Sequence, residues 1–179
     1  MARLEDKKLP PVELWNPDIE REIDMRIARD GAWFYQGSPI ERKRMVQLFS
    51  TVLRHDDDGE FYLVTPVEKL RITVEDAPFV AVAADVLNED ADQTIVFRSN
   101  VDDEVIAGPD NPIRVETDPQ TGEPSPYVLV RKNLWALIAR SVFYRLVDAG
   151  EERVIDGVAQ LGLVSQGAFF VIGAVGEDG

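Results

Sequence analysis

The chain has 179 residues, with 33 acidic against 19 basic side chains, a formal net charge of −14 and no cysteine. A composition of 45% hydrophobic and 29% charged residues is typical of a folded soluble protein rather than of a disordered or fibrous chain. The negative charge argues against nucleic acid and acidic lipid as partners, because both are bound by clustered basic side chains. The absence of cysteine excludes disulfides, thiolate nucleophiles and cysteine-ligated metals.

The acidity belongs to the whole surface and not to a tail, since each half of the chain, divided at residue 90, has a net charge of −7. The N-terminal segment MARLEDKKLPP has no apolar signal region. Polar residues and glycines interrupt the most apolar stretch, residues 158–175, which therefore fits strands better than a membrane span. We expect a cytoplasmic protein without membrane association.

The first half is predicted to form a strand hairpin, a helix and further strands. Strands are expected at residues 23–29 and 33–35, joined by the turn Asp30-Gly31. Ser38-Pro39-Ile40-Glu41 fits a capping box, in which the serine hydroxyl accepts the N3 amide, so a helix is predicted over residues 39–54. The strands expected next are 61–65, 67–74 and 79–86, before a polar run at 88–92.

The second half repeats this plan of strands, helix and strands. The four strands expected before the helix are 94–98, 104–107, 113–117 and 127–130. A helix is predicted over residues 133–149, with its body from 134 to 148, and it is apolar almost all round. Such a helix is buried on several sides or lies in an oligomer interface. The last three predicted strands are 154–157, 160–164 and 168–175.

These elements predict an α+β fold of mostly antiparallel strands with two main helices. The predicted domains are an N-terminal half, residues 1–91, and a C-terminal half, residues 92–179, structurally related and packed together. Gly37-Ser38-Pro39-Ile40 is echoed by Asp110-Asn111-Pro112-Ile113. About 5 residues separate the first motif from its helix and about 20 the second, so an internal repeat and its absence both stay open.

The sequence predicts no catalytic residue, no metal ligand and no particular cofactor. His55, the only histidine, follows the first predicted helix beside three aspartates, and no nucleophile-elbow pattern accompanies it, so a solvated histidine is the preferred interpretation. When Gly59 is set at position 6 of a calcium loop, Arg54 and Thr65 fall where oxygen ligands are required. The glycines also lack the strand, turn and helix context of a phosphate loop.

Two basic clusters stand out in this acidic chain. Arg42, Lys43 and Arg44 lie near the start of the first predicted helix, and Arg131 and Lys132 immediately precede the second. A helix N-terminus with adjacent cations is a ready site for an anion. Arg42, Arg44, Arg131 and Lys132 are therefore candidate ligands of a carboxylate or phosphate group, from a small molecule or a protein partner. Pairing with neighbouring acids on a solvated face is the alternative.

Trp33 and Tyr35 alternate along one predicted strand and so share a face. Core packing is the preferred interpretation of this pair. A ligand-lining aromatic wall is the alternative.

Four segments carry a resemblance to a known family: DGAWFYQGSPI from residue 30, LVTPVEK from residue 63, VEDAPF from residue 74 and TGEP from residue 121. Together they resemble the domain of unknown function 1285 family of uncharacterised bacterial proteins. The resemblance implies two associated, structurally related α+β halves and a ligand-binding or signalling role. It supplies no catalytic residues.

The leading hypothesis is a non-enzymatic cytoplasmic binding or regulatory module, with a small anionic ligand held in a cleft between the two halves. The second hypothesis is a structural or interaction protein that forms a homodimer through the second helix. A carboxylate-based enzyme using Glu68, Glu75 and Asp76 comes third, because paired acids are common at strand ends and act only with a raised pKa.

Overall fold

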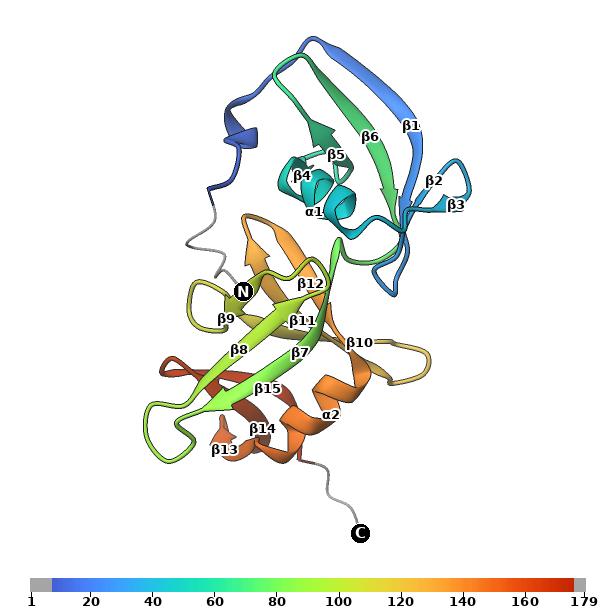
Figure 1. Ribbon diagram of the computed structural model, residues 1–179. Helices are drawn as coiled ribbons and strands as arrows, with labels where there is room; N and C mark the ends of the chain where they lie inside the picture. The colour runs from blue at the N-terminus through green and yellow to red at the C-terminus, as the bar shows by residue number, and fades with distance from the viewer. Residues whose placement is uncertain (1–7, 176–179) are drawn as a thin grey trace.

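Strands dominate the protein, whose computed structural model describes residues 8–175 (Figure 1). Strands account for 51% of the described residues and helices for 12%. The predicted α+β class is therefore wrong, and the fold is mainly β. The prediction overestimated the helical content, because the two segments assigned to helices, residues 39–54 and 133–149, each contain strand residues.

The first domain contains one sheet and one helix, preceded by the 3-10 turn η2 (Val12–Leu14). Its elements are β1 (Ile19–Ile27), β2 (Trp33–Tyr35), β3 (Ser38–Pro39), α1 (Lys43–Thr51), β4 (Leu53–His55), β5 (Phe61–Val64) and β6 (Glu68–Val74).

The second domain contains a six-stranded sheet, a helix and a further three-stranded sheet. Its elements are β7 (Phe79–Leu87), β8 (Thr94–Ser99), β9 (Glu104–Ile106), β10 (Ile113–Thr117), β11 (Pro124–Arg131), β12 (Leu134–Ile138), α2 (Arg140–Asp148), β13 (Glu151–Ile155), β14 (Val158–Ser165) and β15 (Ala168–Ala174). Because β7 belongs to the second sheet, the two sheets divide the chain at residues 75–78, upstream of the predicted boundary at residue 91.

The two six-stranded sheets have the same topology. Their strand orders are β3-β2-β1-β6-β5-β4 and β10-β11-β12-β7-β8-β9. Each sheet consists of two three-stranded antiparallel meanders, joined by one parallel pair: β1 with β6 in the first and β12 with β7 in the second. When the strands are numbered within each domain, every strand has the same neighbours in both. The two halves are thus structurally related.

The predicted capping box does not form. Gln36 and Gly37 both have positive φ angles, 50° and 80°, which suit a two-residue hairpin turn, and Ser38-Pro39 pairs with Phe34 and Tyr35 as an edge strand. Proline is tolerated there because an edge strand leaves amide positions unpaired. The first helix consequently begins at Lys43, with Arg42 at its N-cap, and ends at Thr51 rather than at residue 54.

The predicted helix over residues 133–149 is a strand followed by a shorter helix. Leu134–Ile138 alternates between buried and half-buried residues and pairs with both β11 and β7. This period of two identifies a strand inside a sheet. Only Arg140–Asp148 is helical, and its buried residues are Val142, Phe143 and Leu146.

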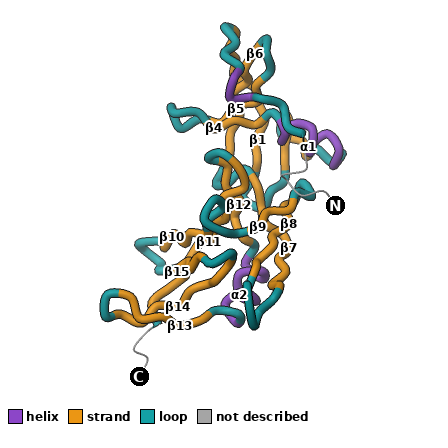
Figure 2. The backbone as a smooth tube through the Cα atoms, turned by 90° about the vertical axis from the view of Figure 1, so that its left-hand side faces the viewer, coloured by secondary structure: helices purple, strands orange, loops and turns teal. Residues whose placement is uncertain are grey.

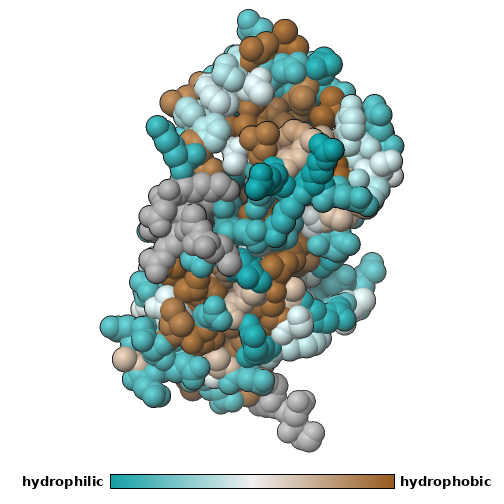
Figure 3. Space-filling model, in the orientation of Figure 1, coloured by the Kyte–Doolittle hydropathy of each residue, from teal (hydrophilic) through white to brown (hydrophobic). Residues whose placement is uncertain are grey.

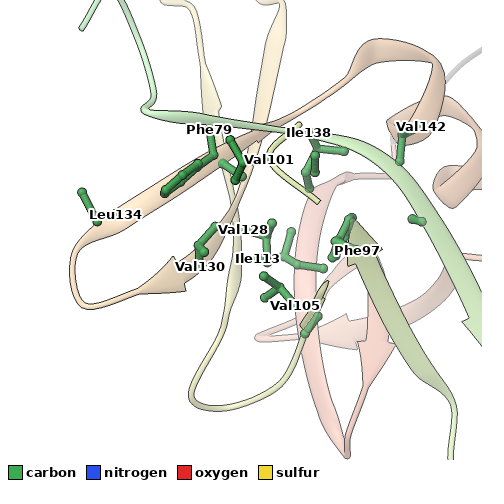
Figure 4. Packing of buried hydrophobic residues seen from close by; sticks show 14 of the residues in the cluster. Phe79, Phe97, Val101, Val105, Ile113, Val128, Val130, Leu134, Ile138 and Val142 are labelled. Carbon is green, nitrogen blue, oxygen red and sulfur yellow. The ribbon is translucent and has the colours of Figure 1, made fainter. Parts of the chain in front are cut away.

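One hydrophobic core continues through both domains. Its buried members include Trp33 and Leu53 from the first domain and Phe79, Val101 and Leu134 from the second. Figure 4 shows the second-domain part of this cluster, where side chains from β7, β8, β11 and β12 converge. The same core therefore holds the two sheets together at their junction.

The junction between the domains forms a waist in the molecule. Figures 1 and 2 show the β11–β12 hairpin extending from the second domain toward the first, and Figure 3 shows hydrophilic side chains gathered across the waist on one face. Polar contacts cross it: Lys43 pairs with Asp102 at 2.8 Å, and Asn100 donates to the carbonyl of Gly31 at 3.2 Å. Core packing inside and polar bonds outside thus fix the two domains against each other.

Candidate functional site

A cavity of about 760 Å³ lies between the two domains on one side of the waist. The first domain lines it with residues 9–13, 16, 51 and 53–58, and the second with residues 131–134 in the β11–β12 turn. We call this cavity the interdomain cleft. Its size is that of typical small-molecule sites, which occur preferentially at domain interfaces.

Arg54 positions the N-terminal segment that forms one wall of the cleft. Its guanidinium Nη1 donates to the carbonyl oxygens of Val12 and Trp15 at 2.8 and 2.7 Å. Its Nε and Nη2 donate to the two carboxylate oxygens of Asp56 at 2.6 and 3.1 Å. This bidentate pair fixes the guanidinium plane, so η2 is held against β4.

A network of charged groups continues behind Arg54. Lys69 Nζ pairs with Asp56 at 3.2 Å and lies 4.2 Å from the ring centre of Tyr62. Burial raises the pKa of Asp56, but hydrogen bonds from Arg54 and Lys69 outweigh it and hold that pKa below its usual value. The Tyr62 hydroxyl donates to Asp58 at 2.6 Å, and this bond and burial raise the pKa of Tyr62. Asp56 and Asp58 are thus engaged by their own domain.

Arg131 supports the opposite wall and is largely buried, with 14% of its side chain exposed. Nη2 donates to the carbonyl of Ser50 at 2.6 Å, near the C-terminal end of α1, and Nη1 lies 3.8 Å from Asp103. A cation there interacts favourably with the unpaired carbonyls of the last helical turn. Burial lowers the pKa of Arg131, and the charge of Asp103 opposes this effect. Arg131, paired with the charge of Asp103, therefore joins the two domains through the carbonyl of Ser50.

Lys132 and Asn133 form the tip of the β11–β12 turn. Lys132 has a φ of 50°, its side chain is 66% exposed, and its closest acidic partner is Glu13 at 3.9 Å. The Asn133 amide donates to the carbonyl of His55 at 3.1 Å, and His55 Nδ1 lies 3.4 Å from the Asn133 carbonyl. The turn thus presents one ammonium group to the cleft and bonds to the facing β4.

The structure separates the residues that the sequence nominated. Trp33 is buried in the core, 6.3 Å from the Phe49 ring, whereas Tyr35 is 45% exposed at the end of β2, and neither lines the cleft. Arg42 and Arg44 lie at the start of α1 and also lie outside it. Only Arg131 and Lys132 reach the cleft, from a hairpin turn rather than a helix start.

Sequence reasoning missed Arg54, Asn133 and the role of His55. Residues 54 and 55 were assigned to a helix end and its following turn, but they belong to β4, which pairs with β5. The sequence carries no alternation that would reveal the turn at residues 132–133, because residues 134–138 are all apolar and alternate only in their burial. Among residues 8–175, no cluster of three or more His, Asp or Glu side chains suits a metal ion. No helix in that range has the length and apolarity of a membrane span.

Comparisons with known proteins identify the family over most of the chain. Residues 10–77 match the DUF1285 N-terminal domain, described as a domain of unknown function, and residues 78–172 match the DUF1285 C-terminal domain. No curated protein matches the sequence.

Two solved structures are similar. A DUF1285 family protein from Silicibacter pomeroyi DSS-3 is 53% identical, with a TM-score of 0.86, over 94% of this chain and 90% of the other. A DUF1285 family protein from Shewanella baltica OS155 shares the fold at 24% identity, with a TM-score of 0.53, over 70% of this chain and 91% of the other. The chain belongs to the DUF1285 family.

Proposed function

We propose that the protein is a binding or regulatory module whose interdomain cleft holds a small anionic metabolite. The observation that carries this proposal is a cavity of about 760 Å³ lined by both domains, with the exposed ammonium of Lys132 at its edge. A ligand that contacts both walls stabilises the folded protein at the junction of its domains, and a change in stability on binding is one basis of a regulatory role.

The lining suggests which groups the ligand carries. Lys132 is the cation that receives the acidic group, because Arg54 is engaged by Asp56, and Arg131 by Ser50 and Asp103. Asp57 and Glu13 are carboxylates on the same cavity, and each accepts hydrogen bonds from ligand hydroxyl or amino groups. A compact metabolite with one acidic end and several donor groups fits this lining.

The alternative functions gain less support. Glu68, Glu75 and Asp76, the carboxylates considered for catalysis, pair with Arg21, Arg26 and Arg29 at 2.9, 2.6 and 3.2 Å. In α2, Val142, Phe143 and Leu146 pack inside their own chain, and Tyr144 is exposed. A homodimer and a cytoplasmic location stay predictions from the sequence.

The test is native mass spectrometry of protein purified from its own cells, followed by calorimetric titration with carboxylate- and phosphate-bearing metabolites. Lys132→Gln is the informative variant, and Arg153→Gln is its control, a half-exposed cation on β13 that lies outside the cleft and away from the waist. We expect one retained ligand per chain and a loss of about tenfold or more in affinity for Lys132→Gln, the usual value of a hydrogen bond to a charged group. Equal affinities for Lys132→Gln and Arg153→Gln would contradict the proposal.

A further inference from the structure

A second cavity, of about 290 Å³, lies at the waist beside the linker between the domains. Asp76, Ala77 and Pro78 of the linker form part of its wall. It shares only His55 and Asn133 with the interdomain cleft. These two residues are hydrogen-bonded to each other, so their contact separates the two cavities. We call this cavity the linker pocket.

Aromatic rings from both domains line the linker pocket. From the first domain come Phe61 and His55, whose rings stack 4.1 Å apart and nearly parallel, at 5°. From the second come Tyr127 and Trp135. The faces of such rings carry negative charge density and attract cations within about 6 Å. The pocket therefore suits a positively charged group.

The chain itself places a planar cation against these rings. The guanidinium carbon of Arg114 lies 4.2 Å from the ring centre of Trp135 and 5.5 Å from that of Tyr127. Its Nη2 pairs with Glu116 at 3.0 Å, and both side chains are about half exposed. An exposed ion pair of this kind contributes little stability, and the ring contacts that Arg114 loses on leaving are ones that an incoming planar cation would make in its place.

Carboxylates complete the lining. Asp76 accepts a hydrogen bond from the Tyr127 hydroxyl at 2.9 Å and pairs with Arg29 at 3.2 Å. Glu116, the second carboxylate, lies on β10, which pairs with the strand of Tyr127. Burial and the hydrogen bond to Asp76 raise the pKa of Tyr127 to about 12. The hydroxyl is therefore protonated at neutral pH and acts as a hydrogen-bond donor to Asp76. The net charge of −14 adds a long-range attraction for cations.

We propose that the linker pocket binds a small planar cation of the guanidinium or amidinium class. The cation stacks on Trp135, donates its N–H groups to Glu116, and displaces the Arg114 side chain into solvent. The proposal does not rest on the anion site in the interdomain cleft, because the cationic and aromatic residues that carry the two sites are different.

The test uses benzamidine as the probe, with benzamide as its neutral analogue and benzoate as its anionic one. ¹⁵N NMR spectra of the full chain follow the indole N–H signals of the three tryptophans and the side-chain amide of Asn133. We expect saturable shifts at Trp135 and Asn133, with Trp15 and Trp33 unchanged. Benzamide should bind about tenfold more weakly, since it lacks the charged hydrogen bond, and benzoate should produce no shift.

Variants separate a cation site from a general aromatic slot. Glu116→Gln should weaken benzamidine binding about fivefold or more, as expected for a lost charged partner, whereas Glu152→Gln on exposed β13 is the matched control that leaves it unchanged. Arg114→Ala should tighten binding, because it removes the competing guanidinium. Lys132→Gln should leave benzamidine binding unchanged, because Lys132 lies outside the linker pocket. The cation site and the anion site can therefore be tested independently.

Two results would overturn the proposal. One is the absence of saturable shifts at Trp135 up to about 20 mM benzamidine, a concentration that covers weak millimolar binding. The other is equal binding of benzamidine and benzamide, which would show a ring slot without preference for charge. The spread of the NMR signals reports in the same spectra that each variant is folded.

Discussion

The two domains arrange six strands in the same order but cover their sheets differently. In the first domain, α1 connects β3 to β4, between the two meanders. In the second domain, a short turn makes the equivalent connection from β9 to β10, and α2 follows the last strand, together with the sheet β13-β14-β15. The shared topology thus fixes the strand pairing, while the covering elements are inserted at different points of the chain.

This difference explains why the internal repeat was ambiguous in the sequence. The two helices do not hold equivalent positions in their domains, so the motifs before them are unequally spaced even though the strands repeat. The equivalent elements are the strands: β1 and β7, for example, both start a meander and both form the parallel pair.

Phe79→Ala should have the largest effect, because it removes a fully buried ring from the core that continues through both domains. We expect a loss of about 3–5 kcal/mol in the free energy of unfolding, the usual range for this substitution. Urea denaturation followed by circular dichroism and tryptophan fluorescence should show one transition, shifted for both probes. Two separated transitions would show that the domains unfold independently. Val154→Ala, on exposed β13, is the control.

Arg131→Ala should have the next largest effect and should differ sharply from Lys132→Ala. Removing Arg131 takes away the bond to the end of α1 and a partner of Asp103, whose side chain is only 4% exposed. Breaking a buried ion pair costs about 3 kcal/mol or more, whereas loss of the exposed Lys132 pair costs at most about 0.5 kcal/mol. Chemical denaturation of both variants measures the contrast. Similar stabilities would show that Arg131 is not a structural link.

Much of the strand layout could be predicted from the sequence, because alternation of apolar and polar residues at 68–74 and 113–117 depends only on which face is buried. The predicted capping box is wrong because a serine and a proline fit an edge strand as well as a helix start. The hairpin turn at Gln36-Gly37 pairs Ser38-Pro39 with β2 and so makes this segment a strand. The helix over 133–149 was wrong because a buried strand is apolar on both faces. Local composition does not distinguish such a strand from a buried helix.

The candidate site contains two of the residues that the sequence nominated, and their role in binding stays a prediction. Arg131 and Lys132 were nominated for their charge in an acidic chain, and both reach the cleft. Their different roles follow from contacts with Ser50, Asp103 and Glu13, which lie far away in the sequence and are brought near by the domain arrangement. Arg54 and Asn133 could not be singled out from the sequence, because their partners Val12, Trp15 and His55 are also distant in the sequence.

Gly31→Ala should have a smaller effect that again depends on the waist. Gly31 has a φ of 92°, and an added Cβ would lie 2.8 Å from the side-chain nitrogen of Asn100 in the second domain. Gly37 has a φ of 80° but no atom within 4 Å of the added Cβ. Backbone strain alone costs about 1–2 kcal/mol, so Gly37→Ala should lose that amount and Gly31→Ala more. Thermal unfolding of the two variants isolates the contact, and equal melting temperatures would contradict its role.

Asp56→Asn should have the smallest effect and should change how stability depends on pH. The pKa of Asp56 is lower in the folded protein than in the unfolded chain, so its contribution is fully present above about pH 4, the usual unfolded value, and is lost as pH falls through the folded pKa. Asparagine keeps one side-chain oxygen that accepts a hydrogen bond from Arg54, so we expect a loss of about 1 kcal/mol at pH 7. Urea denaturation from pH 7 to pH 3 should show a flatter acid limb for Asp56→Asn than for the wild-type chain. Asp56 and its partners Arg54 and Lys69 all belong to the first domain. An unchanged acid limb would show that the loss of stability at low pH arises outside this network.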